Sequence, residues 1–211
     1  MIHSKTLQFI TDGSNVLEII GQVNQVLDGG CRWIQIRMKE FDDKDIEKVL
    51  EAVAPLCKEV GAVCIMNDRV DMAANFHLDG VHLGKEDMCV QEARQILGED
   101  AIIGVTANTI EDIFELSQQP MNYFGIGPMR FTNTKKKLSP VIGLDGYHKI
   151  VSAMREIGIT KPAVAVGGIT LNDVYDLLDL GLWGVAVSGA IAHTSNPTLE
   201  TEKFMEIINK F

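Results

Sequence analysis

Short apolar segments rich in β-branched residues alternate along this chain with longer segments whose apolar positions recur every three or four residues. The first pattern is typical of buried strands and the second of amphipathic helices, so the alternation predicts successive βα units. Eight segments have the strand pattern: 7–11, 33–37, 63–66, 80–83, 102–105, 123–126, 163–166 and 184–187. The helical pattern occupies 15–27, 43–60, 91–97, 109–118, 145–156, 171–180 and 198–210.

Eight evenly spaced strands favour a closed parallel (β/α)8 barrel, the TIM barrel, over an open doubly wound sheet. The turn after the first strand reads Thr-Asp-Gly-Ser-Asn, which is not the Gly-rich fingerprint of dinucleotide-binding sheets. We therefore expect an α/β fold in which residues 1–211 form one compact barrel domain. The irregular stretch 127–143, after the sixth strand, is the predicted active-site loop.

Composition narrows the classes of partner. The 46% of apolar residues and 23% of charged residues are typical of a globular domain, and the net charge of −10 argues against a nucleic-acid surface. The sequence has neither an apolar run long enough for a membrane span nor an export signal at its start. The four cysteines lack paired spacing and are expected to be reduced. We expect a cytoplasmic protein with no nucleic-acid or membrane partner.

The second predicted strand ends in unusually polar residues. Strand alternation sends Gln35, Arg37 and Lys39 to one side and Ile36 and Met38 to the other. Central barrel strands have no solvent face, so three polar side chains pointing inward indicate a ligand. Because active sites of these barrels lie at the carboxyl ends of the strands, Arg37 and Lys39 are candidates for binding an anion.

Two aspartates follow neighbouring strands. Asp68 comes directly after the third strand and Asp87 comes shortly after the fourth, so both should lie on the same rim. Carboxylates combined with waters and substrate phosphates are the ligands that Mg²⁺ prefers, which predicts one magnesium ion at this rim. The alternative is that Asp68 caps the third helix and Asp87 the fourth.

Gly-rich turns follow the last two strands, Gly167-Gly168 after the seventh and Ser188-Gly189 after the eighth. In such barrels these two turns commonly hold a phosphate on backbone amides. The predicted loop adds hydroxyls at Thr132 and Thr134 and a cation at Lys135 beside this corner. Two anion sites on one rim predict two phosphorylated small-molecule substrates, or one substrate with an anion at each end.

Five sequence motifs, taken jointly and in order, resemble the thiamine phosphate synthase family over nearly the whole chain. They are QIRMK at 35–39, NDRVD at 67–71, DGVHLG at 79–84 with Asp87, GP at 127–128 followed by TNTK at 132–135, and VGGI at 166–169. The resemblance implies a TIM-barrel transferase of thiamine biosynthesis, usually a homodimer. The implied reaction joins 4-amino-2-methyl-5-(diphosphooxymethyl)pyrimidine to 4-methyl-5-(2-phosphooxyethyl)thiazole, giving thiamine phosphate and pyrophosphate.

The resemblance also implies roles for individual residues. Asp68 and Asp87 would bind Mg²⁺, and Arg37, Lys39, Thr106 and Lys135 would be catalytic. The residues implied for the pyrimidine diphosphate are Gln35, Ile36, Arg37, Met38, Lys39, Asn67, Thr106 and Lys135. Those implied for the thiazole phosphate are Thr132, Asn133, Thr134, Gly167, Gly168, Val187 and Ser188. Loss of pyrophosphate followed by attack of the thiazole nitrogen needs charge neutralisation and positioning but no general base.

Local departures from the family leave alternatives open. Thr106 stands where the family usually has serine, Asn108 where it often has histidine or threonine, and Lys85 where glutamine is common and where it adds charge near Asp87. His82 either contacts the pyrimidine or fills the barrel rim. The rival functions are a related metal-free thiazole tautomerase, which uses a histidine after the fifth strand, and a non-catalytic barrel that binds a phosphorylated metabolite.

Overall fold

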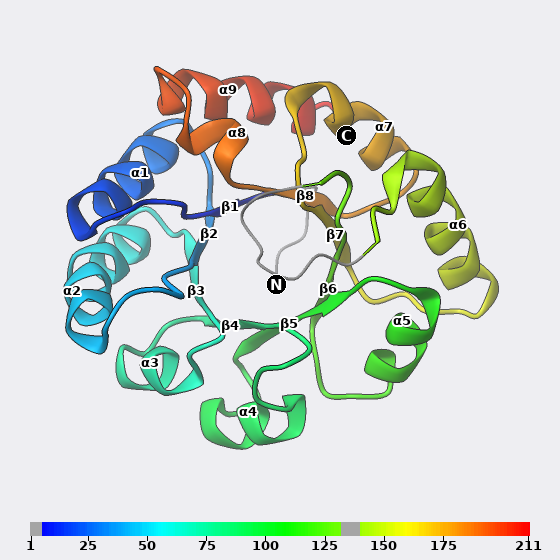
Figure 1. Ribbon diagram of the computed structural model, residues 1–211, viewed down its shortest axis with the longest axis horizontal. Coiled ribbons are helices and arrows are strands. Elements are labelled where there is room, and N and C mark those ends of the chain that lie inside the picture. The colour runs from blue at the N-terminus through cyan, green and yellow to red at the C-terminus, as the bar shows by residue number, and fades with distance from the viewer. Residues whose placement is uncertain (1–5, 132–139) are drawn as a thin grey trace.

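The computed structural model describes residues 6–131 and 140–211, and the strands in it close into one parallel barrel (Figure 1). Each strand pairs with the next in sequence, and β8 closes the barrel on β1 with Thr6 opposite Gly184. The expected (β/α)8 barrel is therefore confirmed. The strands are β1 (Thr6–Ile10), β2 (Trp33–Ile36), β3 (Val63–Asn67), β4 (Gly80–Leu83), β5 (Ile102–Ala107), β6 (Tyr123–Ile126), β7 (Ala163–Val166) and β8 (Gly184–Val187).

Helices form an outer ring around the strands. They are α1 (Val16–Asp28), α2 (Asp43–Glu59), α3 (Val70–Asn75), α4 (Val90–Leu97), α5 (Ile110–Ser117), α6 (Gly143–Glu156), α7 (Val174–Asp179), α8 (Gly189–Ala192) and α9 (Pro197–Ile208). The expected helix 171–180 is divided between a 3-10 turn, η1 (Leu171–Asp173), and α7. The sequence pattern did not reveal α3 and α8, because six and four residues are too few to establish a helical period.

Side-chain capping explains where several helices begin. Asn15 accepts the backbone N–H of Glu18 at the start of α1, and Asp42 accepts that of Asp45 at the start of α2. Thr109 and Asp112 form a reciprocal capping box at the start of α5. These caps end each βα loop within a few residues of its strand, which keeps the loop residues at the carboxyl rim of the barrel.

The apolar core has two parts. The larger one lies between barrel and helices, and a smaller cluster inside the barrel contains Trp33, Ile65, Tyr123, Val164 and Ala186. Alternation along the strands divides side chains between these two cores. The interior cluster fills the barrel below the carboxyl rim, so that a ligand can be held only toward that rim.

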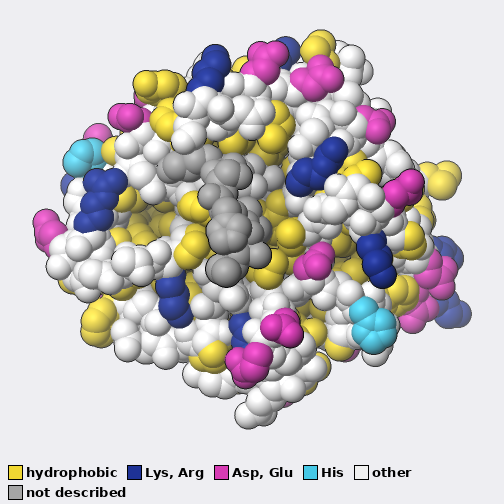
Figure 2. Space-filling view, turned by 180° about the vertical axis from the view of Figure 1, so that it is seen from behind, with side chains coloured by type: hydrophobic (Ala, Val, Ile, Leu, Met, Phe, Trp, Pro, Cys, Tyr) yellow, Lys and Arg dark blue, Asp and Glu magenta, His cyan; other side chains and the backbone are white. Residues whose placement is uncertain are grey.

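The outer surface carries charges of both signs. On the face drawn in Figure 2, lysine and arginine are interspersed with aspartate and glutamate, mainly toward the periphery, and hydrophobic side chains gather toward the middle. Across residues 6–131 and 140–211, none of the helices combines the length and the apolar character required to cross a membrane.

Candidate active site

A cavity of about 400 Å³ opens at the carboxyl ends of the strands. Its walls come from all eight strands or from the turns that follow them. The predicted site residues that line it are Gln35, Arg37, Lys39, Asn67, Asp68, Thr106, Gly167, Gly168 and Ser188. Thr132, Asn133, Thr134 and Lys135 lie outside the described residues, so their predicted roles stay predictions.

The end of β2 alternates as the sequence predicted. Gln35, Arg37 and Lys39 line the cavity, whereas Ile36 and Met38 are buried between barrel and helices. The side chain of Val187 is buried in the same outer layer. Strand alternation turns these three apolar side chains away from the cavity, so contacts between these residues and substrate would have to come from their main chain and stay predictions.

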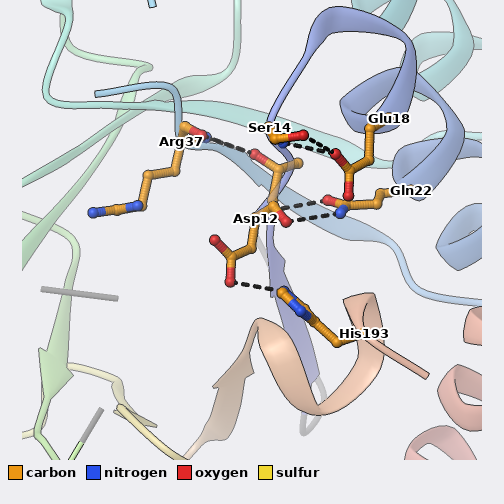
Figure 3. Close-up of polar contacts among 7 residues, drawn as sticks. Asp12, Ser14, Glu18, Gln22, Arg37 and His193 are labelled. Carbon is orange, nitrogen blue, oxygen red and sulfur yellow. Dashed lines mark hydrogen bonds and ion pairs between the residues drawn. The ribbon is translucent and has the colours of Figure 1, made fainter. Parts of the chain in front are cut away.

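Thr11 and Arg37 join the ends of β1 and β2. Thr11 is fully buried, and its Oγ1 accepts the Arg37 N–H at 2.8 Å and donates to the Arg37 carbonyl at 3.2 Å (Figure 3). The backbone ladder between the two strands ends where the Thr11 N–H donates to Gln35 O. The Thr11 side chain extends it by bonding to the backbone of Arg37. Asp12, next in sequence, is held by two hydrogen bonds with the Gln22 amide and by a hydrogen bond of 3.0 Å between its carboxylate and His193 Nε2.

Two buried amides form a matched pair in the cavity wall. Gln35 Nε2 donates to Asn67 Oδ1 at 2.6 Å, while Gln35 Oε1 and Asn67 Nδ2 are buried without a hydrogen-bond partner among the described residues. Turning both amides over would still leave one donor and one acceptor. Unpaired buried polar atoms cost free energy, so the pair is suited to a ligand that offers a donor and an acceptor side by side.

The two predicted magnesium ligands interact directly. Burial, and next the neighbouring Asp87 carboxyl, raise the pKa of Asp68 to about 6, although Lys39 opposes the shift from 2.6 Å. For Asp87, burial favours a higher pKa, but hydrogen bonds from the Asp68 carboxyl and the Gly84 amide outweigh burial and lower it. Asp68 has a positive φ of 66°, which is uncommon outside glycine. Its carboxyl lies beside Lys39 and Asp87.

The capping alternative for these aspartates is wrong. In the described chain, the residue preceding α3 is Arg69 and that preceding α4 is Cys89, and neither helix has a side-chain cap. The Asp87 carboxylate instead accepts the Gly84 N–H at 2.6 Å. Within the described residues no third His, Cys, Asp or Glu joins the pair. Two carboxylates fit Mg²⁺, because this ion keeps several waters and takes further oxygens from substrate phosphates.

The turn after β7 is built for close approach of backbone. Gly167 and Gly168 have φ values of 92° and 73°, and a Cβ at Gly167 would lie 2.7 Å from Pro128 Cβ. Arg130 holds this turn, since its N–H donates to Gly167 O at 3.0 Å and its guanidinium donates to Gly168 O at 2.9 Å. The same guanidinium binds both carboxylate oxygens of Asp173.

The turn after β8 supplies a hydroxyl to the same cavity. Ser188 Oγ is buried and has no hydrogen-bond partner within the described residues. Gly167, Gly168 and Gly189 line the cavity with it. A buried hydroxyl beside glycine turns provides the small donors that bind phosphate oxygens.

Comparison with known proteins identifies the family. Residues 7–191 match the family model described as thiamine monophosphate synthase. This chain belongs to that family. It is 46% identical to the thiamine-phosphate synthase of Bacteroides thetaiotaomicron over 96% of this chain and 97% of the relative. It is 44% identical to that of Flavobacterium johnsoniae, over 95% and 94%. The family expected from the motifs, and its class as a transferase, are thereby confirmed.

Solved structures agree. Thiamine phosphate pyrophosphorylase from Pyrococcus furiosus superposes with a TM-score of 0.85 at 30% identity, covering 98% of this chain and 96% of that one. A second structure, described as native KDPGal, superposes at 0.75 with 14% identity, over 100% and 97% of the two chains, and shows only that the barrel is shared.

Two departures from the family pattern have clear structural consequences. Lys85, expected to add charge near Asp87, forms an ion pair at 2.6 Å with Asp112 at the start of α5. Asn108 lines the cavity, and its side-chain amide donates to the Gly127 carbonyl, which ties the β5 loop to the β6 loop. Residues 104–108, the neighbourhood in which the rival tautomerase is expected to use a histidine, contain none.

Several site residues were not predicted. Gln8 lines the cavity from β1, Tyr123 lies beneath the rim, and Arg130 anchors the Gly167-Gly168 turn. Asp173, which binds Arg130, was also not predicted. Among these residues it alone has a recognisable sequence signal, because it stands three residues after Thr170 as in a capping box. The others depend on barrel closure, which brings together strands far apart in sequence.

Proposed function

We propose that this chain condenses the aminopyrimidine methyl diphosphate with the thiazole ethyl phosphate, releasing pyrophosphate and giving thiamine phosphate. The observation that carries the proposal is the unpartnered donor and acceptor of Asn67 and Gln35, buried beside Arg37 and Lys39. An aminopyrimidine edge offers an amino N–H next to a ring nitrogen, which matches this pair. The diphosphate then extends toward the two cations.

The proposed reaction breaks the bond between the pyrimidine methylene carbon and a diphosphate oxygen, and the electron pair leaves with pyrophosphate. Arg37 and Lys39 stabilise the charge that develops on the leaving group, and Thr106 donates a hydrogen bond on the same side. The thiazole nitrogen supplies the electron pair of the new bond to carbon. No proton has to be removed, so the residues act by positioning and charge neutralisation.

Asp68 and Asp87 are proposed to hold one Mg²⁺ per active site, which when bound neutralises charge on the diphosphate oxygens. The closeness of the two carboxylates supports this, because they repel each other unless a proton or a cation lies between them. Lys39 contacts Asp68 in the structure, so its ammonium lies beside the proposed magnesium and diphosphate site.

The thiazole phosphate is proposed to bind the turns after β7 and β8. Ser188 Oγ and the backbone around Gly167 and Gly168 would donate to its oxygens, with Thr132, Asn133 and Thr134 contributing from the loop after β6 and Lys135 reaching the diphosphate. We further propose a cytoplasmic homodimer. Apolar side chains at Ile10, Val164 and Ala186 line the cavity and limit water near the reacting carbon.

A turnover assay with both phosphorylated precursors, with Mg²⁺ and with excess chelator, tests the proposal. Product should form only with both precursors and should be lost on chelation. Failure to form thiamine phosphate would overturn the proposed function, and formation untouched by chelator would overturn the magnesium role alone.

Asn67→Asp tests the amide pair, since it replaces the unpartnered donor by an acceptor of the same size. The KM for the pyrimidine substrate should rise about tenfold or more, which corresponds to one lost hydrogen bond in a buried site. The KM for the thiazole phosphate should stay unchanged. Asn24→Asp, an exposed change on α1, is the matched control. Equal behaviour of the two variants would contradict the assignment.

A further inference from the structure

A continuous chain of side-chain hydrogen bonds crosses the interior of the barrel, and three of its four residues, Gln8, His82 and Thr106, line the cavity. Gln8 Nε2 donates to Tyr123 Oη at 2.9 Å, and Tyr123 Oη lies 2.9 Å from His82 Nδ1. His82 Nε2 lies 3.0 Å from Thr106 Oγ1. The four residues come from β1, β6, β4 and β5, and each is at most 9% exposed.

Glycines on the barrel strands make room for this chain. A Cβ at Gly104 would lie 2.1 Å from the Tyr123 ring, and a Cβ at Gly125 would lie 2.8 Å from His82 Cε1. Glycine inside a strand weakens it and is typical of places where another group must approach closely. Trp33 packs edge-on against Tyr123 at 4.7 Å between ring centroids and fixes the phenol from below.

The chain has a direction, because each group has a limited number of protons. The Tyr123 hydroxyl accepts from Gln8, so its single hydrogen is free to point at His82 Nδ1. Burial raises the pKa of Tyr123, which keeps that hydrogen in place. A neutral His82 that accepts at Nδ1 carries its proton on Nε2 and donates it to Thr106 Oγ1. The Thr106 hydroxyl then has its own hydrogen left for the cavity.

We infer that Gln8, Tyr123 and His82 are positioning residues. Gln8 and Tyr123 fix the tautomer of His82, and His82 then makes Thr106 present a hydrogen-bond donor to an anionic oxygen of the substrate. The inference rests on the proposed function for the identity of that oxygen, which belongs to the diphosphate. It also assigns His82 a role between its two expected ones, since the ring acts through Thr106 and need not contact the pyrimidine.

Reversing the chain at its far end is the sharpest test. Gln8→Glu replaces the donor to Tyr123 by an acceptor of nearly equal size. Tyr123 then donates to the new carboxylate and accepts from His82 Nδ1–H, which leaves Nε2 to accept from Thr106. The lone pairs of Thr106 now face the substrate oxygen. Gln8→Met is the matched control, because it removes the donor without supplying an acceptor.

The tautomer can be observed directly by ¹⁵N NMR of protein labelled in its histidine rings, with His82 assigned from its missing signals in His82→Gln. The wild type should carry the ring proton on Nε2, and Gln8→Glu at alkaline pH should carry it on Nδ1. A proton on Nδ1 in the wild type, or the same tautomer in both proteins, would overturn the inference. If Gln8→Glu fails to fold, Tyr123→Phe replaces it, and an unchanged, fully Nε2-protonated ring in that variant would be equally contradictory.

Kinetics and pyrophosphate binding give a second readout. In Gln8→Glu, kcat/KM for the diphosphate substrate should fall at least about tenfold, as expected for one hydrogen bond to a charged oxygen, while the KM for the thiazole phosphate stays unchanged. Binding of inorganic pyrophosphate with Mg²⁺ should weaken in parallel, and Gln8→Met should lose less. A wild type that shows the expected tautomer but no turnover would refute the proposed function and leave the hydrogen-bond chain intact. Normal turnover and pyrophosphate binding in Gln8→Glu would refute the chain alone.

Discussion

Thr11 Oγ1 accepts the backbone N–H of Arg37 and donates to the backbone carbonyl of the same residue. The one buried hydroxyl of Thr11 therefore bonds to both backbone polar groups of Arg37, at the point where the β1–β2 ladder would otherwise end. Arg37 lines the cavity from this point. The guanidinium of Arg37 is proposed to bind the diphosphate. By holding the Arg37 backbone, the Thr11 hydroxyl therefore fixes the point from which this side chain extends.

Thr11→Val removes the hydroxyl without changing the shape of the side chain. It removes the two part-buried hydrogen bonds between Thr11 Oγ1 and the Arg37 backbone, so the free energy of unfolding should fall by about 1–3 kcal/mol. The KM for the pyrimidine diphosphate should rise more than the KM for the thiazole phosphate. Urea unfolding and steady-state kinetics measure both effects. Thr11→Ser keeps the hydroxyl and should stay close to wild type; a serine variant as impaired as the valine variant would show that packing, not hydrogen bonding, matters.

The raised pKa of Asp68 makes a prediction about stability and pH. The folded protein holds the proton up to about pH 6, whereas the ordinary value of 3.8 applies when the chain unfolds. Between these values the folded state binds more protons, so this group's contribution to the free energy of unfolding falls as pH rises. Asp68→Asn removes the contribution. With chelator present, the stability of Asp68→Asn relative to wild type should therefore improve as pH increases from about 4 to about 6.

Glu18 is the natural control for that measurement, because its pKa is shifted in the opposite direction. Hydrogen bonds from the Ser14 amide and hydroxyl lower it, and the stability they contribute is lost as pH falls below 4.5. Glu18→Gln should thus be relatively less stable at neutral pH and approach wild type in acid. A stability difference between Asp68→Asn and wild type that did not vary with pH would contradict the raised pKa of Asp68.

The sequence predicted the direction of the side chains at the end of β2 but not the contact between Gln8 and Tyr123, for a physical reason. Gln35, Arg37 and Lys39 stand two apart on one strand, so their common direction follows from strand alternation alone. Gln8 and Tyr123 are 115 residues apart, and each reads locally as an ordinary strand residue. Their contact exists only because β1 and β6 face each other across a closed barrel, and no local pattern encodes it.

Short elements were hidden for a related reason. The six residues of α3 follow the end of β3 almost at once, and the positive φ of Asp68 makes that abrupt turn possible. Nothing in the identity of an aspartate distinguishes this role from helix capping. The structure separates the two, because the Asp68 carboxyl faces Lys39 and Asp87 and not the first amides of α3.

Lys85 should matter less than its position in the DGVHLG motif suggests. Its ammonium binds Asp112, which already accepts from the backbone N–H groups of Asn108 and Thr109, and the lysine side chain is 44% exposed. Exposed ion pairs contribute about 0–1 kcal/mol. Lys85→Gln, which restores the residue common in the family, should leave kcat and the Mg²⁺ dependence of turnover within about twofold of wild type. A large change in the magnesium requirement would instead place the Lys85 charge at the Asp68–Asp87 pair.

The ion pair between Arg130 and Asp173 should affect the binding of the thiazole phosphate without contacting it. Asp173 is buried, and besides the guanidinium it accepts hydrogen bonds from the Thr170 hydroxyl and N–H, so it connects the loop after β6 to the start of η1. Arg130 in turn holds the carbonyls of Gly167 and Gly168. Arg130→Lys cannot form the paired hydrogen bonds and should loosen the turn.

We expect Arg130→Lys to raise the KM for the thiazole phosphate about threefold to thirtyfold, which is the range for a lost charge-assisted hydrogen bond when the turn partly rearranges to compensate. The KM for the diphosphate should stay unchanged. Asp173→Asn should give the same pattern with a larger loss of stability, because the carboxylate is the more buried partner. Lys203→Gln, which breaks an exposed ion pair with Glu200 on α9, is the control and should change neither constant. Equal changes in both KM values would mean that the pair supports the barrel as a whole and not the turn, whereas a selective change assigns the turn to one substrate.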